Sequence, residues 1–491
     1  MTPRARNHAR FAAVLPVLAL LAASLLGALR PAAAQTEAGQ PVDNPYSVNV
    51  FLHKEVEEWK IDRTLQMVAE ANIPWIKQEF PWQEIEFQKN YFHDDKWDKS
   101  AWEKFDRIVD MAEKYDLKII ARVGHPPAWA KADDGSGPLK DNQDLADFTN
   151  ALLDHYDGRI QYVQVWNEPN LAAEWVPGQA VEPEGYADMM KTVYPAVKQE
   201  HPDAVILSAP LAITLEGTSL RGNMNELEYW AGLYDNGIKD NFDIASANAY
   251  GLDQPPDAPP GERMLNFRRV ELLRAIMEDN DDADKPIWLN EYAWNASPES
   301  LPEEEKNYWR HVTEEQQAEW TVQGVEYARQ NWPWAGVISI WYFRQVGDIP
   351  PEKAEYYFRM VNPDFTTTPV YEAVKDDAAK YPGPAAQVEG TPTVAAPTPT
   401  TAAAVEPTAT TAAGEPTATS AASSPTAAAA TPTTAAAVPT ATPEGGAVAG
   451  ASGNNTLLYV LGGALVIAGL AGLGYYFMRG RGTSTNDPSK T

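Results

Sequence analysis

Two short apolar segments of this 491-residue chain end in the same pair of residues, an asparagine followed by a glutamate. The first, YVQVWNEPN, covers residues 162–170 and contains Glu168, and the second, IWLNEY, covers residues 287–292 and contains Glu291. Alternating β-branched and aromatic residues are typical of buried strands. Pro169 cannot continue a strand and restricts the residue before it. Each segment therefore predicts a strand with a carboxylate at its C-terminal tip.

A pair of carboxylates is what glycoside hydrolysis requires, because one protonates the leaving oxygen while the other attacks the sugar or activates a water. The acid needs a raised pKa, and a nearby ionised Glu291 would raise the pKa of Glu168. The chain has no cysteine, and its seven histidines form no His-Glu-x-x-His or similar cluster. We therefore expect a site without a metal or another cofactor.

The elements that must position these groups follow from an alternation of short apolar runs with amphipathic stretches, which predicts βα units and a parallel sheet. Glu168 and Glu291 are separated by three units of roughly 40 residues each, so they fall on strands four and seven of a (β/α)8 TIM barrel over residues 44–382. An open doubly wound sheet is the alternative, but no glycine-rich phosphate turn follows any strand. Strands are predicted at 47–52, 75–80, 118–123, 162–166, 205–208, 244–249, 287–290 and 337–341, and helices at 61–71, 102–115, 145–156, 185–200, 262–279, 315–330 and 371–379.

The two ends of the chain indicate export and anchoring. Residues 1–34 combine a basic start, an apolar run and a small-residue site, which predicts a cleaved signal peptide or, alternatively, an uncleaved anchor. Residues 383–453 are rich in Thr, Ala and Pro and predict a disordered stalk. Residues 457–478 carry no charge and predict a transmembrane helix, followed by a basic cytoplasmic tail at 479–491. The barrel would then be extracellular. A formal net charge of -29 argues against nucleic acid as a partner and fits a neutral substrate.

The motifs together resemble those of clan A glycoside hydrolases, the barrel superfamily that includes the family 5 cellulases and the family 39 xylosidases. The resemblance is carried by WNEPN at 166–170 and LNEY at 289–292, with FPW at 80–82, HPPAW at 125–129 and Trp341 in support. It covers the body of the chain but not the stalk or the predicted membrane span.

This resemblance implies a retaining mechanism, with Glu168 as general acid/base and Glu291 as nucleophile. It implies that Asn167 binds the sugar 2-hydroxyl, that Tyr250 orients Glu291, and that Trp341 forms the floor of the subsite on the non-reducing side of the cleaved bond.

Six further residues are expected at the substrate. Relatives usually carry arginine at the position of Lys77 and often histidine at that of Asn248, so these two departures concern specificity and rate more than reaction type. His125 is predicted at a strand end. The remaining three are tryptophans at strand ends, which either stack on sugar or complete the core: Trp82, Trp129 and Trp294.

The sequence thus predicts a retaining glycosidase that acts outside the cell on a β-linked oligo- or polysaccharide. Two alternatives use the same barrel. One is a non-catalytic cell-surface module that binds carbohydrate, and the other is a transglycosylase with the same glutamate pair. The sugar and the choice between exo and endo cleavage are left open.

Overall fold

The computed structural model describes residues 42–384 except 133–136, 178, 218–221 and 348. The predicted signal peptide, stalk, transmembrane helix and tail lie outside these residues. Within the described residues, no helix is long and apolar enough to cross a membrane.

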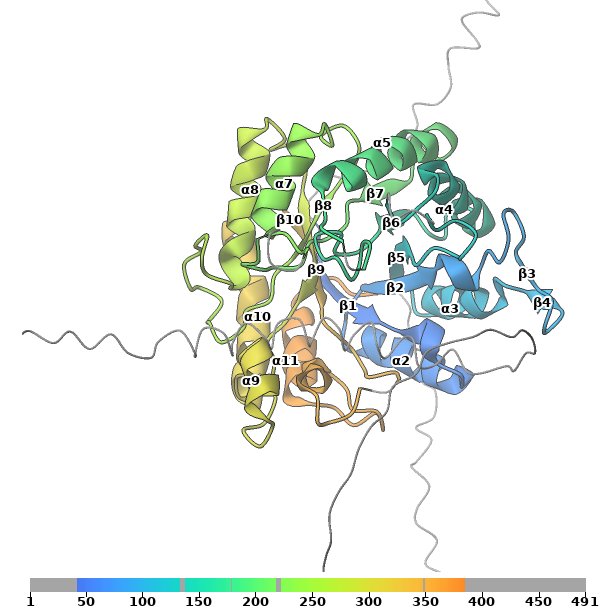
Figure 1. The fold of residues 1–491 in the computed structure, drawn as a ribbon. Coiled ribbons are helices and arrows are strands. Elements are labelled where there is room, and N and C mark those ends of the chain that lie inside the picture. Colours follow the sequence, from blue (N-terminus) through green and yellow to red (C-terminus); the bar gives the residue numbers. More distant parts are fainter. Residues whose placement is uncertain (1–41, 133–136, 178, 218–221, 348, 385–491) are drawn as a thin grey trace, which may run out of the picture. The chain divides into compact units, whose positions relative to one another are not determined.

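Eight parallel strands form the centre of the domain, as the sequence predicted (Figure 1). They are hydrogen-bonded in the order β7-β6-β5-β2-β1-β10-β9-β8. A parallel bridge between Leu207, at the end of β7, and Ile244, directly before β8, connects the two outermost strands and nearly closes the barrel. The barrel strands are β1 (Tyr46–Val50), β2 (Trp75–Pro81), β5 (Lys118–Gly124), β6 (Tyr162–Val165), β7 (Val205–Leu207), β8 (Ala245–Asn248), β9 (Ile287–Tyr292) and β10 (Ala335–Ile340).

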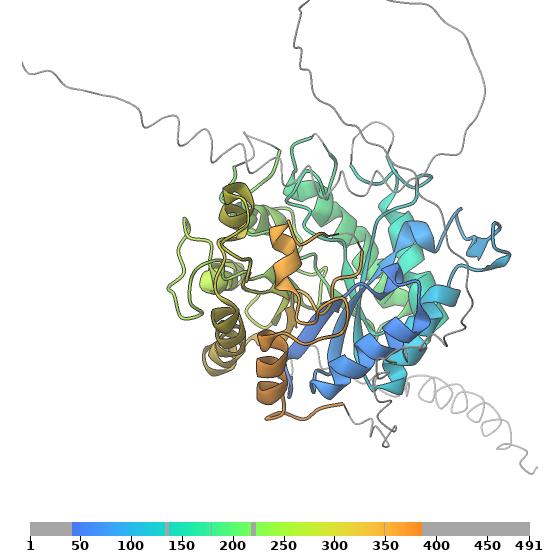
Figure 2. The same ribbon diagram turned by 90° about the horizontal axis from the view of Figure 1, so that it is seen from below.

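Helices surround these strands in both ribbon views (Figures 1 and 2). A small hairpin of β3 (His93–Asp94) and β4 (Lys99–Ser100) extends from the connection that follows β2. The helices are α2 (Glu58–Glu70), α3 (Glu103–Lys114), α4 (Asn142–Tyr156), α5 (Pro183–Glu200), α7 (Glu226–Asp235), α8 (Val270–Asp279), α9 (Glu303–Trp309), α10 (Glu314–Asn331) and α11 (Pro369–Ala378), with short 3-10 helices at Leu52–Lys54, Trp82–Glu84, Phe267–Arg269 and Ala354–Phe358.

The helix boundaries differ from the predicted ones by a few residues in most cases, and the largest difference is at the start of α8. The sequence pattern placed a helix over residues 262–279, but α8 begins only at Val270, after a 3-10 turn that starts at Phe267. Asn266 is extended and its side-chain amide donates to the carbonyl of Pro259, 2.9 Å away. Because Asn266 is extended, it cannot belong to a helix, and α8 starts directly after the 3-10 segment that follows it.

The barrel interior is filled by aromatic side chains near the N-terminal ends of the strands. Trp75 and Tyr162 begin β2 and β6, and Trp288 is the second residue of β9. Their ring centroids lie 4.9 to 5.3 Å apart. Because residues two apart share a face of a strand, the same face of β2 that carries Trp75 carries Lys77 and Glu79 nearer its C-terminal end. The interior therefore changes from aromatic to charged along the strands, and the charged end faces the rim where the predicted carboxylates lie.

Candidate active site

The two glutamates lie at the C-terminal ends of β6 and β9, on the same rim of the barrel. After β6 the chain turns sharply, since Trp166 (φ 72°) and Glu168 (φ 39°) both have left-handed backbone angles. Such angles are costly for these residue types and are concentrated at functional sites. The turn is held by hydrogen bonds from Trp166 N to the carbonyl of Val123 (2.9 Å) and from Glu168 N to that of Pro210 (3.0 Å).

A bulge in β9 places Glu291. Between the pairs Ala247–Leu289 and Asn248–Glu291, β9 has one residue more than β8, and the ladder to β10 is irregular at the same place. One extra residue reverses the face on which the following side chains lie, and bulges near active sites commonly re-aim a side chain in this way. Glu291 is buried at the end of this strand.

Asn248 joins the two carboxylates. Its amide nitrogen donates to Glu168 Oε1 at 2.7 Å and to Glu291 Oε2 at 3.4 Å. Because both oxygens are bound to one nitrogen, these two oxygens can be at most about 6 Å apart, and such a close approach is compatible with the 5–5.5 Å between the carboxyl groups of retaining glycosidases.

Glu291 is surrounded by donors from other strands. The Tyr250 hydroxyl donates to Glu291 Oε2 at 2.8 Å, and Lys77 Nζ lies 3.4 Å from Glu291 Oε1. Burial lowers the pKa of Lys77, although the neighbouring Glu291 opposes that change. A carboxylate with this set of donors is held in one orientation.

Glu168 has the opposite environment. Burial, followed by the negative charges of Glu291 and Glu174, raises the pKa of Glu168 well above its ordinary value. Arg122 and the Asn248 amide oppose the rise without cancelling it. A carboxyl group in this environment is suited to the task of a proton donor.

A second charged cluster beside the pair was missed by the sequence interpretation. Glu79 on β2 lies 2.5 Å from His125 Nε2 and 3.6 Å from His53 Nε2. Burial favours a raised pKa for Glu79, but Arg122 and His125 outweigh it and hold the pKa well below the ordinary value. Burial lowers the pKa of His53 to about 3. The alternation of Lys77 and Glu79 on one strand face was the available sequence signal for this cluster.

The other predicted substrate residues separate into two groups. His125, with a left-handed φ of 52°, is exposed, whereas Asn167 is buried and its Oδ1 has no hydrogen-bond partner among the described residues. Trp341 and Trp129 are partly buried, Trp341 beside Phe51 at a ring distance of 5.4 Å. These four side chains remain predicted contacts for substrate.

Two of the predicted sugar-stacking tryptophans are fully buried, and that prediction is corrected. Trp82 donates to Glu86 Oε2 at 2.5 Å and stacks on Phe148. Trp294 donates to the carbonyl of Gln254 at 2.7 Å. Neither ring offers a face to a ligand in this structure, so both complete the core.

Aromatic side chains near Glu291 that the sequence did not single out form a separate cluster around Tyr250. Trp309, at the end of α9, packs against the Tyr250 ring at 4.9 Å, and Phe51 packs against Trp341. Trp309 and Phe51 are partly buried. We call Phe51, Trp309, Trp341 and Tyr250 the aromatic cluster. It is built from segments following β1, β8, β9 and β10, so no single motif could have shown it.

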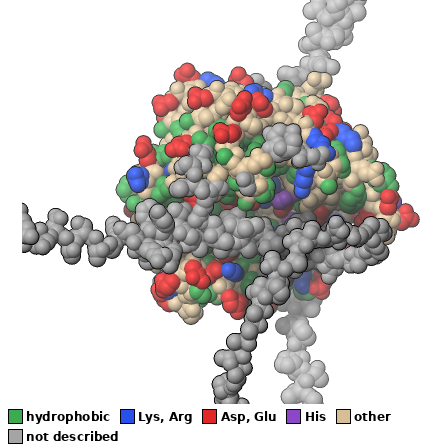
Figure 3. Space-filling model, in the orientation of Figure 1, with side chains coloured by type: hydrophobic (Ala, Val, Ile, Leu, Met, Phe, Trp, Pro, Cys, Tyr) green, Lys and Arg blue, Asp and Glu red, His purple; other side chains and the backbone are tan. Residues whose placement is uncertain are grey.

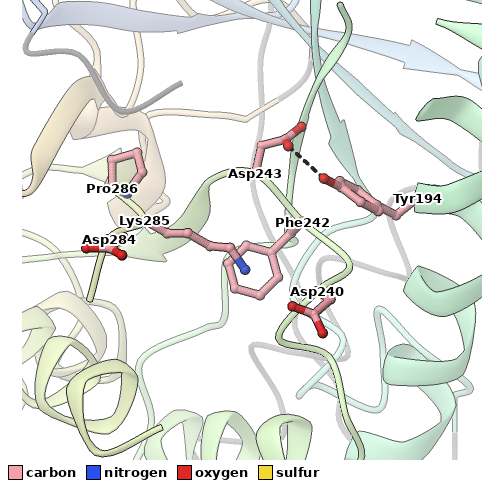
Figure 4. Close-up of a pocket in the computed structure, with 7 residues that line it drawn as sticks. All are labelled: Tyr194, Asp240, Phe242, Asp243, Asp284, Lys285 and Pro286. Carbon is pink, nitrogen blue, oxygen red and sulfur yellow. Dashed lines mark hydrogen bonds between the residues drawn. The ribbon is translucent and has the colours of Figure 1, made fainter. Parts of the chain in front are cut away.

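A cavity of about 330 Å³ lies at the other end of the strands, where Asp243 and Pro286 precede β8 and β9 (Figure 4). Two of its charged groups are paired with neighbours: Asp243 accepts from the Tyr194 hydroxyl at 2.8 Å, and Lys285 pairs with Asp282 at 3.1 Å. Asp154, Glu200 and His201, on α4 and at the end of α5, are the one group among the described residues with metal-ligand spacing. Neither feature adds chemistry to the glutamate pair.

No protein-family model matches this sequence, and no curated protein sequence matches it. Solved structures do match it. A family 39 glycoside hydrolase from Bacteroides cellulosilyticus WH2 has a TM-score of 0.50 and 20% identity over 70% of this chain and 64% of that one. The GH39 enzyme from Xanthomonas axonopodis pv. citri has a TM-score of 0.50 and 17% identity over 70% and 68%. This chain has the same barrel fold as these proteins.

A GH5_18 protein from Streptomyces cattleya, solved in complex with GlcNAc, has a TM-score of 0.50 and 15% identity over 70% of this chain and 80% of that one. The chain spans less than two thirds of the Bacteroides protein. At these identities the likeness concerns the fold alone. The resemblance to family 5 and family 39 barrels is therefore confirmed for the fold, and activity has to be argued from the site.

Proposed function

We propose that this protein is a retaining glycoside hydrolase in which Glu168 is the acid/base and Glu291 the nucleophile. The observation that carries the proposal is the Asn248 amide nitrogen, which donates to both carboxylates and so brings one oxygen of each to within about 6 Å of the other. At that separation the second carboxylate can reach the anomeric carbon itself, whereas an attacking water would need more space.

In the first step, Glu168 gives its proton to the glycosidic oxygen as that bond breaks, and Glu291 forms a bond to the anomeric carbon. The raised pKa of Glu168 keeps the proton available near neutral pH. The donors Tyr250 and Lys77 keep Glu291 aligned for attack. In the second step, Glu168, now ionised, takes a proton from water, whose oxygen attacks the anomeric carbon and releases Glu291.

The substrate proposed is a neutral β-linked oligo- or polysaccharide. In the described part of the chain, two cations near the pair each have an acidic neighbour: Lys77 has Glu291, and Arg122 lies 4.0 Å from Glu174. Figure 3 shows acidic side chains spread over the visible face of the domain. Such a surface repels polyanions. The aromatic cluster offers rings for the apolar faces of sugars.

The proposal includes the location outside the cell, which rests on the sequence of residues 1–34 and 457–491. Protease added to intact cells should release the barrel and leave a small membrane-bound fragment. A barrel that is digested only after cell lysis would contradict the proposed topology.

Substitution of the two glutamates tests the function. We expect Glu291→Gln to abolish hydrolysis of every aryl glycoside that the parent cleaves. Glu168→Gln should lose most activity on substrates with poor leaving groups and much less on dinitrophenyl glycosides, because these need no proton. Glu319→Gln, on the exposed face of α10, is the matched control and should behave as the parent. Sugar binding without hydrolysis in the parent would favour a non-catalytic module, and sugar transfer to an added acceptor would favour a transglycosylase.

A further inference from the structure

The seam between β7 and β8 differs from the other strand pairs. These strands are joined near Leu207 and Ile244, and Ser208 N donates to the carbonyl of Ile244 at 3.0 Å. Beyond Ser208 the chain that follows β7 is no longer part of the sheet. A cavity of about 20 Å³ lies beside the end of β8. It is lined by Asn248 on the barrel side and by Arg269 and Glu226 on the helix side, with apolar residues between them.

Two buried polar groups line this cavity without a partner. Asn248 and Arg269 are 3% and 2% exposed. In the described part of the chain, Asn248 Oδ1 and Arg269 Nη2 make no hydrogen bond. The other groups of the same side chains are all bonded: Asn248 Nδ2 to the two carboxylates, Arg269 Nε to Glu226, and Arg269 Nη1 to the carbonyl of Glu262 at 2.7 Å.

Buried polar groups without partners are costly, and small polar cavities in proteins usually hold water. A volume of about 20 Å³ is sufficient for one water, which needs two to four polar partners. Arg269 Nη2 is a donor, Asn248 Oδ1 is an acceptor, and the Glu226 carboxylate on the same wall is a further acceptor. The site has the size and the complementary chemistry for a single water molecule.

We infer that one ordered water occupies this cavity and connects Arg269 to Asn248, so that Arg269 positions the glutamate pair from outside the barrel wall. The water accepts from Arg269 Nη2 and donates to Asn248 Oδ1. The hydrogen bond from this water to Asn248 Oδ1 fixes the orientation of the amide, with Nδ2 toward the two carboxylates. With the amide reversed, its oxygen would face two carboxylates and neither would have this donor. The role in catalysis rests on the proposed function, whereas the water site itself does not.

The connection reaches into the helix layer. Glu226 is the first residue of α7, and its Oε2 accepts from Thr214 N at 3.0 Å, in the connection that follows β7. Arg269 lies directly before α8. The helices after β7 and β8 are thereby coupled to the rim through one buried ion pair and one water.

A crystal structure of the protein tests the water directly. We expect one ordered water within hydrogen-bond distance of both Arg269 Nη2 and Asn248 Oδ1. The absence of such a water in a map that shows other buried waters would overturn the inference. This result does not depend on any activity, so it also separates the inference from the proposed function, which fails if the parent cleaves no glycoside.

Filling the cavity tests the positioning role. Val270 lines the cavity, so Val270→Ile adds a methyl group about the size of the water without altering Asn248 or Arg269. The matched control is Val325→Ile in α10, a fully buried position that does not line the cavity and carries the same cost of overpacking.

We expect kcat for Val270→Ile to fall roughly tenfold, the effect of losing about one hydrogen bond to a charged group. The high-pH limb of its activity profile should also move to higher pH, because the Asn248 hydrogen bond lowers the pKa of Glu168. The other charged groups around Glu168 (Glu291, Glu174 and Arg122) are unchanged by the substitution. A Val270→Ile variant with the kcat and pH profile of Val325→Ile would overturn the positioning role.

Discussion

Removing Lys77 should destabilise the protein more than removing any exposed lysine. Lys77 and Glu291 are 3% and 7% exposed and their charged atoms lie 3.4 Å apart. Breaking a buried ion pair by deleting one partner typically costs about 3–5 kcal/mol, because the remaining charge stays buried. Tyr250 and Asn248 still donate to Glu291 in Lys77→Met, so we expect a loss near the lower end, about 3 kcal/mol.

Urea denaturation of parent and variant measures this loss. With a denaturant slope of about 3 kcal/mol per molar, the midpoint of Lys77→Met should fall by about 1 M while the slope stays unchanged. The double variant Lys77→Met, Glu291→Gln should recover most of the stability, since no uncompensated charge remains. The control is Lys104→Met, which breaks a partly exposed pair with Glu84 and should cost at most about 1 kcal/mol. A Lys77→Met midpoint equal to that of the control, or a double variant that recovers nothing, would refute the reasoning.

Three further changes are predicted for the site. Activity should be lost at high pH as Glu168 loses its proton. Asn248→Ala should lower kcat and move the high-pH limb of the kcat/KM profile to higher pH. An unshifted limb would contradict the assignment of Glu168. Trp341→Ala should raise KM about tenfold with a smaller change in kcat, measured by initial rates, because a stacking surface is lost; an unchanged KM would remove Trp341 from the subsite. Glu79→Gln should weaken binding of the reaction product, measured by calorimetric titration, because His125 loses the carboxylate that contacts it; unchanged affinity would make the cluster purely structural.

The barrel could be predicted from sequence because its signals are local. Each strand is a short apolar run, and the repeat length then fixes which strand carries each glutamate. The helix at α7 was not predicted, although Asn225 caps it by accepting from Leu227 N at 2.9 Å. Its hydrophobic pattern is weak, because the helix is short and carries acidic residues in its first turn.

Burial and pairing across the barrel were harder to predict. Trp82 and Trp294 follow strand ends just as Trp129 and Trp341 do, and only packing against neighbouring elements separates a core ring from an accessible one. The interaction of Glu79 with His53 and His125 joins three segments far apart in sequence. Nothing in a single strand indicates which side chains of other strands will face it.

The configuration of the product formed first tests the central claim most directly. The full-length protein is mixed with a β-linked substrate that it cleaves, and the anomeric protons are followed by NMR before mutarotation equilibrates them. Two successive displacements, at Glu291 and then by water, predict that the β-anomer appears first. Initial release of the α-anomer would show a single displacement by water and would contradict the assignment of Glu291 as the nucleophile.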